Sequence, residues 1–283
     1  MPAPTDGYGM RFSIEQIKQK VAQAKRKVLE MCLRANLGHL TTAYSCAEIV
    51  AALYYGIMRV DPKRPQWVDR DRFVMSKNHG SLMTYPILAD IGFFDSVELD
   101  NFMLDGTRLG GHSKLGIPGA DFSGGSLGIG LGVAAGLSYS AKMDGKKWMT
   151  FAIVGDAESY EGSIWEAAMF AAHNELNNLV VFLDRNRLGV SGFTEELLRL
   201  EPIADKWSAF GWEVRNVDGH NIKDLFSILE DIRERSSNKP LIIIAETIKG
   251  NGIDFMSNAP LYHGIPPKSA DAERAFRQLE IIE

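Results

Sequence analysis

Several features that define other protein classes are scarce or missing in this sequence of 283 residues. It has only two cysteines, Cys32 and Cys46, which are too few for a disulfide framework and favour a reducing, cytoplasmic environment. Residues 1–9 show no apolar core behind a basic start, so no secretory signal is expected. The net charge is −5 and no dense block of Lys and Arg occurs, which excludes a general nucleic-acid binder.

One uncharged stretch has roughly the length of a membrane span. Residues 122–141 carry no charge, but they include six glycines and four serines. The average apolarity of such a segment is low for a helix that faces lipid. We therefore predict a buried Gly-rich loop that runs into a helix, and no membrane association.

The sequence is rich in the material of a globular α/β domain. Hydrophobic residues make up 45% of the chain and charged residues 24%, which are ordinary values for a folded protein. The runs 180–182 and 241–244 are continuously apolar, as strands are when a parallel sheet is buried on both faces. We predict a parallel sheet flanked by helices on both faces, in a single domain over residues 13–283 behind a tail at 1–12.

Hydrophobic periodicity and capping signals place the individual elements. We expect strands at 72–75, 148–154, 179–183, 212–217 and 240–246. We expect helices at 13–35, 47–58, from about 81 to 91, at 127–142, 163–176, 203–210, 222–235 and from 270 onward. Polar residues follow four of the strands, and ligands of such sheets bind beyond the carboxyl ends of the strands.

Two oxygen-bearing side chains follow consecutive predicted strands. Asp156 and Asn186 are thirty residues apart, the length of a strand–helix–strand crossover, so the fold can bring them side by side. A hard divalent cation takes about six oxygen ligands. A diphosphate and a backbone carbonyl, such as that of Leu188, would complete the set. The alternative is that Asp156 caps the next helix and Asn186 only turns the chain.

Glycines and histidines mark further candidate sites. The run 124–132 holds many glycines at the start of a predicted helix, where backbone N–H groups can approach a phosphate or where helices can pack tightly. Five of the six histidines stand next to a glycine, which favours accessible loops for them. An imidazole in such a loop can donate or accept a proton near neutral pH. Zinc is a weaker alternative, because the sequence has neither a His-Glu-x-x-His pair nor a cysteine cluster.

Three acids follow the strand that ends at Gly155. Glu158, Glu161 and Glu166 lie at or near a predicted helix N-terminus, where the helix dipole favours negative charge. Capping and solvation explain them simply. A buried acid at a subunit interface is the sharper hypothesis.

Taken in order, these segments resemble the N-terminal, diphosphate-binding half of a transketolase. The resemblance runs from about residue 13 to 267 and depends on the ordered set, since each piece alone is unspecific. The matching segments are Gly38-His39, the run from Asp69 to Gly80, Gly110-Gly111-His112, Gly125-Ser126-Leu127-Gly128, Gly155-Asp156 through Asn186, and Thr247 to Gly252 followed by Tyr262-His263-Gly264.

This resemblance implies thiamine diphosphate as cofactor, with Mg²⁺ or Ca²⁺ held by Asp156, Asn186 and the carbonyl of Leu188. The residues expected around the cofactor are His79, Gly125, Ser126, Leu127, Gly155, Asp156, Ala157, Asn186, Leu188 and His263. The residues expected to act on the sugar by hydrogen bonding and proton transfer are His39, His79, His112 and His263. Glu161, with Glu166, matches family acids at the dimer interface that links two active sites.

The resemblance also implies an activity and a partner. The expected reaction moves a two-carbon ketol unit from a phosphorylated or otherwise anionic ketose to an aldose. The pyrimidine-binding and C-terminal domains of a full transketolase have no counterpart here, so we expect a second subunit that carries them, in a heterotetramer of two copies each. Alternatives are a 1-deoxyxylulose-phosphate synthase-like subunit, a 2-oxoacid dehydrogenase α-like subunit, or a non-catalytic cofactor-binding subunit.

Some positions depart from the family pattern beside the expected sugar pocket. Leu40 stands where the family usually has Pro, and Ser113-Lys114 follow His112 in place of Pro-Glu. These changes leave room for a specialised ketose or aldose. Lys114 or Arg108 can meet an anionic substrate group, although both also fit solvated loop charges.

Overall fold

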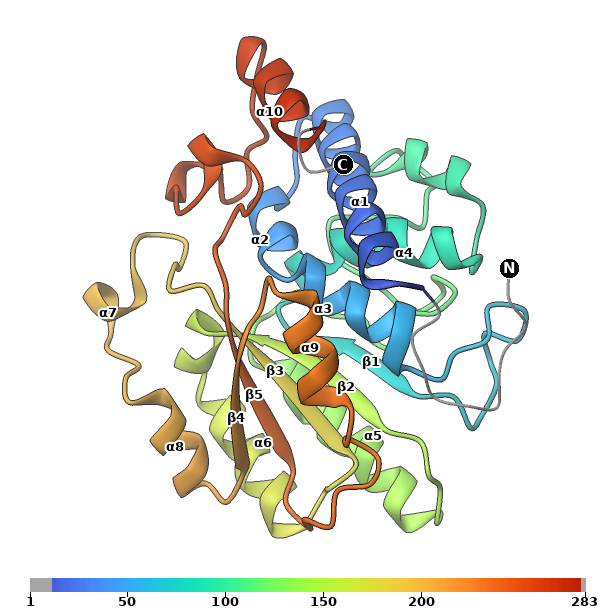
Figure 1. Cartoon of the computed structure of the whole chain (residues 1–283), viewed down its shortest axis with the longest axis vertical. Coiled ribbons are helices and arrows are strands. Elements are labelled where there is room, and N and C mark those ends of the chain that lie inside the picture. Colours follow the sequence, from blue (N-terminus) through green and yellow to red (C-terminus); the bar gives the residue numbers. More distant parts are fainter. Residues whose placement is uncertain (1–11, 281–283) are drawn as a thin grey trace.

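The computed structural model describes residues 12–280. A five-stranded sheet with the order β1-β2-β3-β5-β4 forms its centre (Figure 1). All four strand pairings are parallel, which confirms the predicted sheet type. The strands are β1 (Arg72–Met75), β2 (Thr150–Gly155), β3 (Leu179–Arg185), β4 (Glu213–Asp218) and β5 (Leu241–Glu246).

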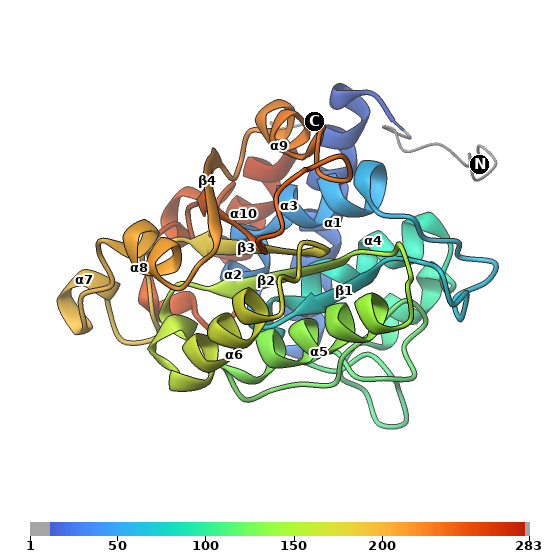
Figure 2. The ribbon, with the colours of Figure 1, turned by 90° about the horizontal axis from the view of Figure 1, so that it is seen from below.

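Helices cover both faces of this sheet, as Figure 2 shows for α5 and α6 below it and α3 and α9 above it. The α-helices are α1 (Ile14–Ala35), α2 (Leu40–Ser45), α3 (Ala47–Ala52), α4 (Thr84–Ile91), α5 (Ile129–Met143), α6 (Gly162–His173), α7 (Thr194–Leu197), α8 (Ile203–Ala209), α9 (Ile222–Leu229) and α10 (Ala270–Glu280). Short 3-10 turns occupy Asn78–Met83, Ser96–Asn101, Ala157–Tyr160, Asp254–Met256 and Pro260–Tyr262.

The alternation of side chains along β3 divides the core into two layers. Val180 and Phe182 pack into the cluster under α1 and α3, whereas Val181 and Leu183 pack into the cluster under α5 and α6. All four are fully buried. Because both faces of the strand need apolar side chains, its sequence is continuously apolar, which is the pattern that predicted the sheet.

The first predicted helix is confirmed together with its cap. Ser13 precedes α1, its hydroxyl accepts from the backbone N–H of Gln16, and the Gln16 side chain accepts from the backbone N–H of Ser13. This reciprocal pair is a capping box, which satisfies two donors that a helix start otherwise leaves free.

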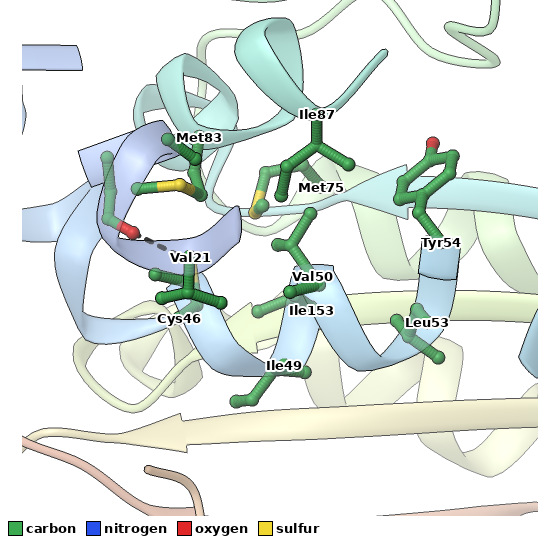
Figure 3. Packing of buried hydrophobic residues seen from close by; sticks show 14 of the residues in the cluster. Val21, Cys46, Ile49, Val50, Leu53, Tyr54, Met75, Met83, Ile87 and Ile153 are labelled. Atoms are coloured by element: carbon green, nitrogen blue, oxygen red, sulfur yellow. Dashed lines mark hydrogen bonds between the residues drawn. The ribbon is translucent and has the colours of Figure 1, made fainter. Parts of the chain in front are cut away.

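The region after α1 differs from the prediction. The expected helix 47–58 ends as an α-helix at Ala52 and continues as one π-helical turn, Leu53–Ile57. The helix α2 was not predicted, because every residue of it is buried and it shows no amphipathic stripe. Figure 3 shows the apolar side chains of this region, such as Val50 and Leu53, packed near Met75 and Ile153 of the sheet.

Other boundaries shift by a few residues. The helices expected to end at 176 and 235 end at His173 and Leu229, and α7 was not predicted. The predicted tail lies outside the described residues except for Phe12, whose ring meets that of Tyr55 edge-on at 5.5 Å between centroids. The single-domain boundary, with its last three residues likewise undescribed, stays a prediction.

The uncharged stretch 122–141 forms a loop and most of α5, as expected. Among residues 12–280, no helix combines the length and apolarity needed to cross a membrane.

Candidate functional site

The ends of β2 and β3 bring the two predicted oxygen ligands together. Asp156 is buried, and its Oδ2 accepts from the backbone N–H of Arg187 at 2.5 Å, one residue beyond Asn186. Its Oδ1 accepts from the backbone N–H of Ala157 at 2.7 Å. Asp156 therefore caps the turn Ala157–Tyr160 while its carboxylate faces the loop after β3. The alternative, that Asp156 caps α6, is wrong, because Glu161 holds that position. Asp156 does meet the backbone next to Asn186, as predicted.

The amide of Asn186 has a fixed orientation. Its Nδ2 donates to Asp184 Oδ2 at 3.1 Å, and its Oδ1 accepts from the backbone N–H of Leu188 at 3.0 Å. An amide oxygen has two lone pairs, so Oδ1 keeps one for a further ligand. Arg187, between Asn186 and Leu188, adopts a left-handed conformation at φ 63°. A non-glycine residue held in this region is typical of a loop constrained by function.

Asp184 is the centre of a buried polar network that ties three strand ends to α2. It accepts hydrogen bonds from Ser45 at 2.5 Å, from Asn186 and from Thr247, and it forms an ion pair with Lys77. Burial opposes the ionisation of Asp184, but the charge of Lys77 and the hydrogen bonds from Lys77, Ser45 and Thr247 together lower its pKa. Because every partner is satisfied, this network fixes the loops after β1, β3 and β5 relative to one another.

Lys249 is a buried cation without a carboxylate partner among the described residues. Its Nζ donates to the carbonyls of Leu188 at 3.1 Å and Gly189 at 3.2 Å, and it lies 2.9 Å from Nδ1 of His263. Burial and the nearby Lys77 lower its pKa to about 8. A buried ammonium held mainly by neutral groups attracts an anionic ligand.

The Gly-rich loop before α5 lies beside this cation-bearing end of the sheet. Gly125 and Ser126 are exposed, and a side chain on Gly125 would meet nothing within 4 Å. Gly128 has φ +85°, and a Cβ there would overlap Ser163 and Glu161, so this position requires glycine. Its N–H donates to Glu158 Oε1 at 2.9 Å.

Glu158 joins three loops of the site. Its carboxylate accepts from the Ser76 hydroxyl at 2.6 Å and from the backbone N–H groups of Gly128 and Gly155. The side chain is buried, and burial raises its pKa above the ordinary value. The simple expectation of a solvated capping acid is therefore wrong for Glu158, which fixes the Gly-rich loop against the ends of β1 and β2.

Four histidines from four distant segments form one cluster. The ring centroid of His39 lies 5.2 Å from that of His79, 5.9 Å from that of His112 and 5.1 Å from that of His263. The centroids of His79 and His263 are 5.5 Å apart. His39 Nδ1 is buried and has no hydrogen-bond partner among residues 12–280. An unpaired polar atom in such a cluster is typical of a ligand-binding site.

The imidazoles of this cluster are held in the neutral form. Burial lowers the pKa of His263 to about 4, with a further contribution from Lys249. Burial, and then Lys77, lower the pKa of His79 well below the ordinary value. Burial and His112 lower the pKa of His39. A neutral imidazole both donates and accepts a hydrogen bond, which suits recognition of sugar hydroxyls and proton transfer.

Several predicted residues lie elsewhere. His220 accepts from Ile248 N–H and contacts Glu48, so it braces the loop after β5. Glu161 is exposed at the N-terminus of α6, makes no capping bond, and no described contact brings it to the histidines. Arg108 forms an ion pair with Glu98, while Lys114 is exposed.

The donor set at the ends of β2 and β3 fits a hard divalent cation. It consists of a carboxylate oxygen, an amide oxygen and a carbonyl oxygen, the ligand types that Mg²⁺ and Ca²⁺ prefer. Burial and the nearby Asp184 raise the pKa of Asp156 despite Arg185, so the site favours an added cation beside this carboxylate. The part of the chain that the structure describes holds no group of three or more His, Cys, Asp or Glu able to bind a metal.

Sequence reasoning assigned no role to three contributors: Lys77, Asp184 and Lys249. Each is a charged residue within three positions of the end of a strand and is buried. Buried charges need partners, and position after an apolar strand is the only signal that the sequence offers for them.

Members of one known protein family are similar to this sequence over most of its length. The family described as "Transketolase, thiamine diphosphate binding domain" matches residues 17–280. The chain is 37% identical to one subunit of the apulose-4-phosphate transketolase of Phocaeicola vulgatus, covering 95% of both chains. It is 39% identical to the 6-deoxy-6-sulfo-D-fructose transketolase subunit SqwG of a Clostridium species, covering 93% of this chain and 96% of that protein.

A solved structure agrees with these relatives. The transketolase of Campylobacter jejuni superposes with a TM-score of 0.87 at 29% identity, over 95% of this chain. This chain spans 43% of the Campylobacter chain. The resemblance predicted from the ordered motifs is thereby confirmed, and the chain belongs to the transketolase family through its thiamine diphosphate binding domain.

Proposed function

We propose that this chain is the N-terminal subunit of a two-subunit transketolase, which transfers a two-carbon ketol unit from an anionic ketose to an aldose. The proposal rests on a cluster of four histidines, one of which, His263, contacts Lys249, whose ammonium also donates to the carbonyl of Leu188. Lys249 thus offers a positive charge that can hold a diphosphate. The histidine cluster offers hydrogen bonding and proton transfer for a sugar.

The cofactor assigned to this site is thiamine diphosphate with Mg²⁺ or Ca²⁺. Asp156 Oδ1, Asn186 Oδ1 and the carbonyl of Leu188 would hold the metal, and Lys249 would balance the remaining diphosphate charge. Gly125 and Ser126 are exposed, so their backbone would be accessible to the cofactor. When bound, thiamine diphosphate supplies the carbon nucleophile and the electron sink for breaking the bond next to a ketose carbonyl.

The remaining residues assigned to the cofactor line the same end of the sheet. Gly155 and Ala157 flank Asp156, and the Gly155 N–H is held by Glu158, so the backbone near the metal is fixed. Leu127, half-buried after Ser126, offers an apolar surface to the ring of the cofactor. His79 and His263 close this side from two loops.

The histidines bind and protonate the sugar in this proposal. His39 Nδ1 and Nε2 are available to donate to a sugar hydroxyl or accept its proton, since Nδ1 has no partner among the described residues and Nε2 faces Gly264. His263 Nδ1 is engaged by Lys249, which leaves Nε2 to face the cluster. His112 is exposed, so it is the histidine that we assign to the arriving acceptor aldose.

A partner subunit would complete the enzyme. The two subunit relatives have nearly the same length as this chain, whereas the transketolase chain of Campylobacter is more than twice as long. We propose a second subunit with the pyrimidine-binding and C-terminal domains, in a heterotetramer of two copies each. Exposed Glu161, with Glu166 further along α6, would lie at the interface between catalytic centres.

The substrate class and location follow from charge and redox chemistry. The names of the two relatives refer to a phosphorylated sugar and a sulfonated sugar, both anionic, and Lys114 is exposed near His112. We therefore propose an anionic ketose as donor. Cys32 and Cys46 are buried free thiols, in keeping with a cytoplasmic enzyme.

Reconstitution tests the proposal. The chain and its partner subunit, purified separately, are mixed with thiamine diphosphate and Mg²⁺ and assayed for ketol transfer from a phosphorylated ketose. Activity is expected only when both subunits are present, and replacing Asp156 by Ala abolishes it. Robust turnover by the chain alone would refute the need for a second subunit. Failure of the pair to bind thiamine diphosphate would refute the cofactor assignment.

A further inference from the structure

Arg185 is a fully buried cation at the end of β3, next to Asn186 in the sequence. Its guanidinium contacts three carboxylates: Asp156 Oδ2 at 3.1 Å, Glu195 Oε1 at 2.8 Å and Glu201 Oε1 at 2.8 Å. It also donates to the Thr194 hydroxyl at 2.8 Å. A planar guanidinium can serve several acceptors at once, so this one residue joins the metal-binding carboxylate to the segment that follows the loop.

The two oxygens of Asp156 have different surroundings. Oδ2 accepts from Arg185 and from the backbone N–H of Arg187, whereas Oδ1 accepts only from the backbone N–H of Ala157 among the described residues. The guanidinium therefore holds the carboxylate so that Oδ1 faces a ligand. The same guanidinium also competes with a metal ion for the negative charge of Asp156. A strong Arg185–Asp156 pair would therefore weaken the attraction between this carboxylate and a bound cation.

Glu195 and Glu201 limit this competition, because they bind the same guanidinium as Asp156. Their side chains are 35% and 44% exposed, and both lie in the segment that carries α7, at the margin of the molecule in Figure 1. Each is itself fixed by backbone donors, Leu200 N–H for Glu195 and Ile203 N–H for Glu201. Each lies 2.8 Å from the guanidinium, and Asp156 lies 3.1 Å from it, so the three carboxylates share its positive charge.

We propose that Arg185 is a positioning residue for Asp156 and that Glu195 and Glu201, which would not touch the metal, set the affinity of the site for its divalent cation through Arg185. This inference rests on the proposed function, because it assumes the metal site at Asp156. When both glutamates are replaced by glutamine, Asp156 is the one carboxylate left on Arg185 among the described residues, and it loses part of its attraction for the metal.

The test measures cation affinity directly. The full chain, copurified with its partner subunit in saturating thiamine diphosphate, is titrated with Mn²⁺, and free Mn²⁺ is followed by electron paramagnetic resonance. Partners of metal ligands typically change affinity by about 10–100-fold. Because the glutamates act at one further remove, E195Q/E201Q is expected to raise the Mn²⁺ dissociation constant by about 3–10-fold. The matched control is E196Q, an adjacent acid that does not contact Arg185.

A double-mutant cycle separates the role of Arg185 from general charge loss. In an R185M background, E195Q/E201Q is expected to change the Mn²⁺ constant by less than about half the factor seen in the wild type. Thermal stability of the cofactor-free protein serves as the readout of a merely structural role. An unchanged constant in E195Q/E201Q, or equal effects from E196Q, would overturn the inference. A wild-type complex that binds no Mn²⁺ with thiamine diphosphate would instead overturn the proposed function. If R185M does not fold, the comparison of E195Q/E201Q with E196Q decides the matter alone.

Discussion

The ends of β2, β3 and β5 and the histidine cluster lie side by side but are built in opposite ways. Around Asp184, buried charges are paired and every amide has its partner, so the loops are locked. Around His39, the rings pack against one another, the imidazole is held neutral, and His39 Nδ1 has no hydrogen-bond partner among the described residues. A network that is fully satisfied suits an anchor, whereas unpaired groups suit a site whose partners change during a reaction.

This difference leads to separable effects of substitution. Changes at the strand ends should act on cofactor binding and leave sugar chemistry intact once the cofactor is bound. Changes in the histidine cluster should act on turnover and leave cofactor binding intact. Kinetic and binding constants therefore distinguish the two regions, because loss of a transition-state contact lowers kcat while loss of ground-state binding raises a dissociation constant.

The largest effect is expected for Asp156→Ala in the reconstituted enzyme. The variant loses the one anionic ligand proposed for the metal and leaves Arg185 without its most buried carboxylate partner. We expect thiamine diphosphate binding in the presence of Mg²⁺ to weaken by at least about 100-fold, as measured by calorimetry. Circular dichroism and assembly with the partner serve as controls for folding. Unchanged cofactor affinity would break the distinction between the two regions.

His39→Asn is expected to have the second largest effect, on turnover alone. Removing a proton-transfer group typically costs about 10²–10⁴-fold in rate. We expect kcat for ketol transfer to fall by about 100-fold, while the dissociation constant of thiamine diphosphate stays within about twofold, since Nδ1 of His39 contacts no described residue of the anchor. Weaker binding of thiamine diphosphate with an unchanged kcat would instead assign His39 to the cofactor-binding region at the strand ends.

Lys249→Met sharpens the boundary, because Lys249 contacts both Leu188 and His263. Removing its positive charge takes away a charge-assisted contact to the diphosphate, and we expect about 10-fold weaker binding of thiamine diphosphate. Thiamine, which lacks the diphosphate, is the matched control ligand, and its binding should not change. A greater loss in kcat than in cofactor affinity would assign Lys249 to the sugar site.

The sequence was sufficient for the parts of the site that depend on topology. Asp156 and Asn186 could be placed side by side because parallel strands joined by a crossover end at the same edge of the sheet. The histidines next to glycines could be assigned to loops from those glycines, and four of these histidines do meet. Fold class and motif order also followed from pattern alone.

The parts that were missed depend on packing. Lys77 and Asp184 look like ordinary polar residues after a strand, and only the closed structure shows that they neutralise each other in the interior. The burial of Glu158 could not be foreseen, because its three hydrogen-bond donors come from Ser76, Gly128 and Gly155. No local sequence pattern links these segments. The helix α2 has no amphipathic face, so periodicity could not detect it.

The smallest expected effect concerns stability in acid. In the folded protein the pKa of His263 lies at about 4, below the ordinary value of 6.5, because the side chain is half-buried and lies near the charges of Lys249, His39 and Lys77. The unfolded chain therefore binds a proton first as the pH falls. The associated stability is fully present above about pH 6.5 and is lost progressively toward pH 4.

His263→Gln removes this contribution, so the variant should lose less stability in acid than the wild type. Between about pH 7.5 and 5 we expect the difference to be on the order of 1 kcal/mol in the free energy of unfolding, measured by urea denaturation. His173→Gln, at the exposed end of α6, is the matched control and should follow the wild type. Parallel pH profiles for wild type and His263→Gln would mean that the cluster accepts protons freely, and the contrast between a neutral reactive region and a charged anchor would then fail.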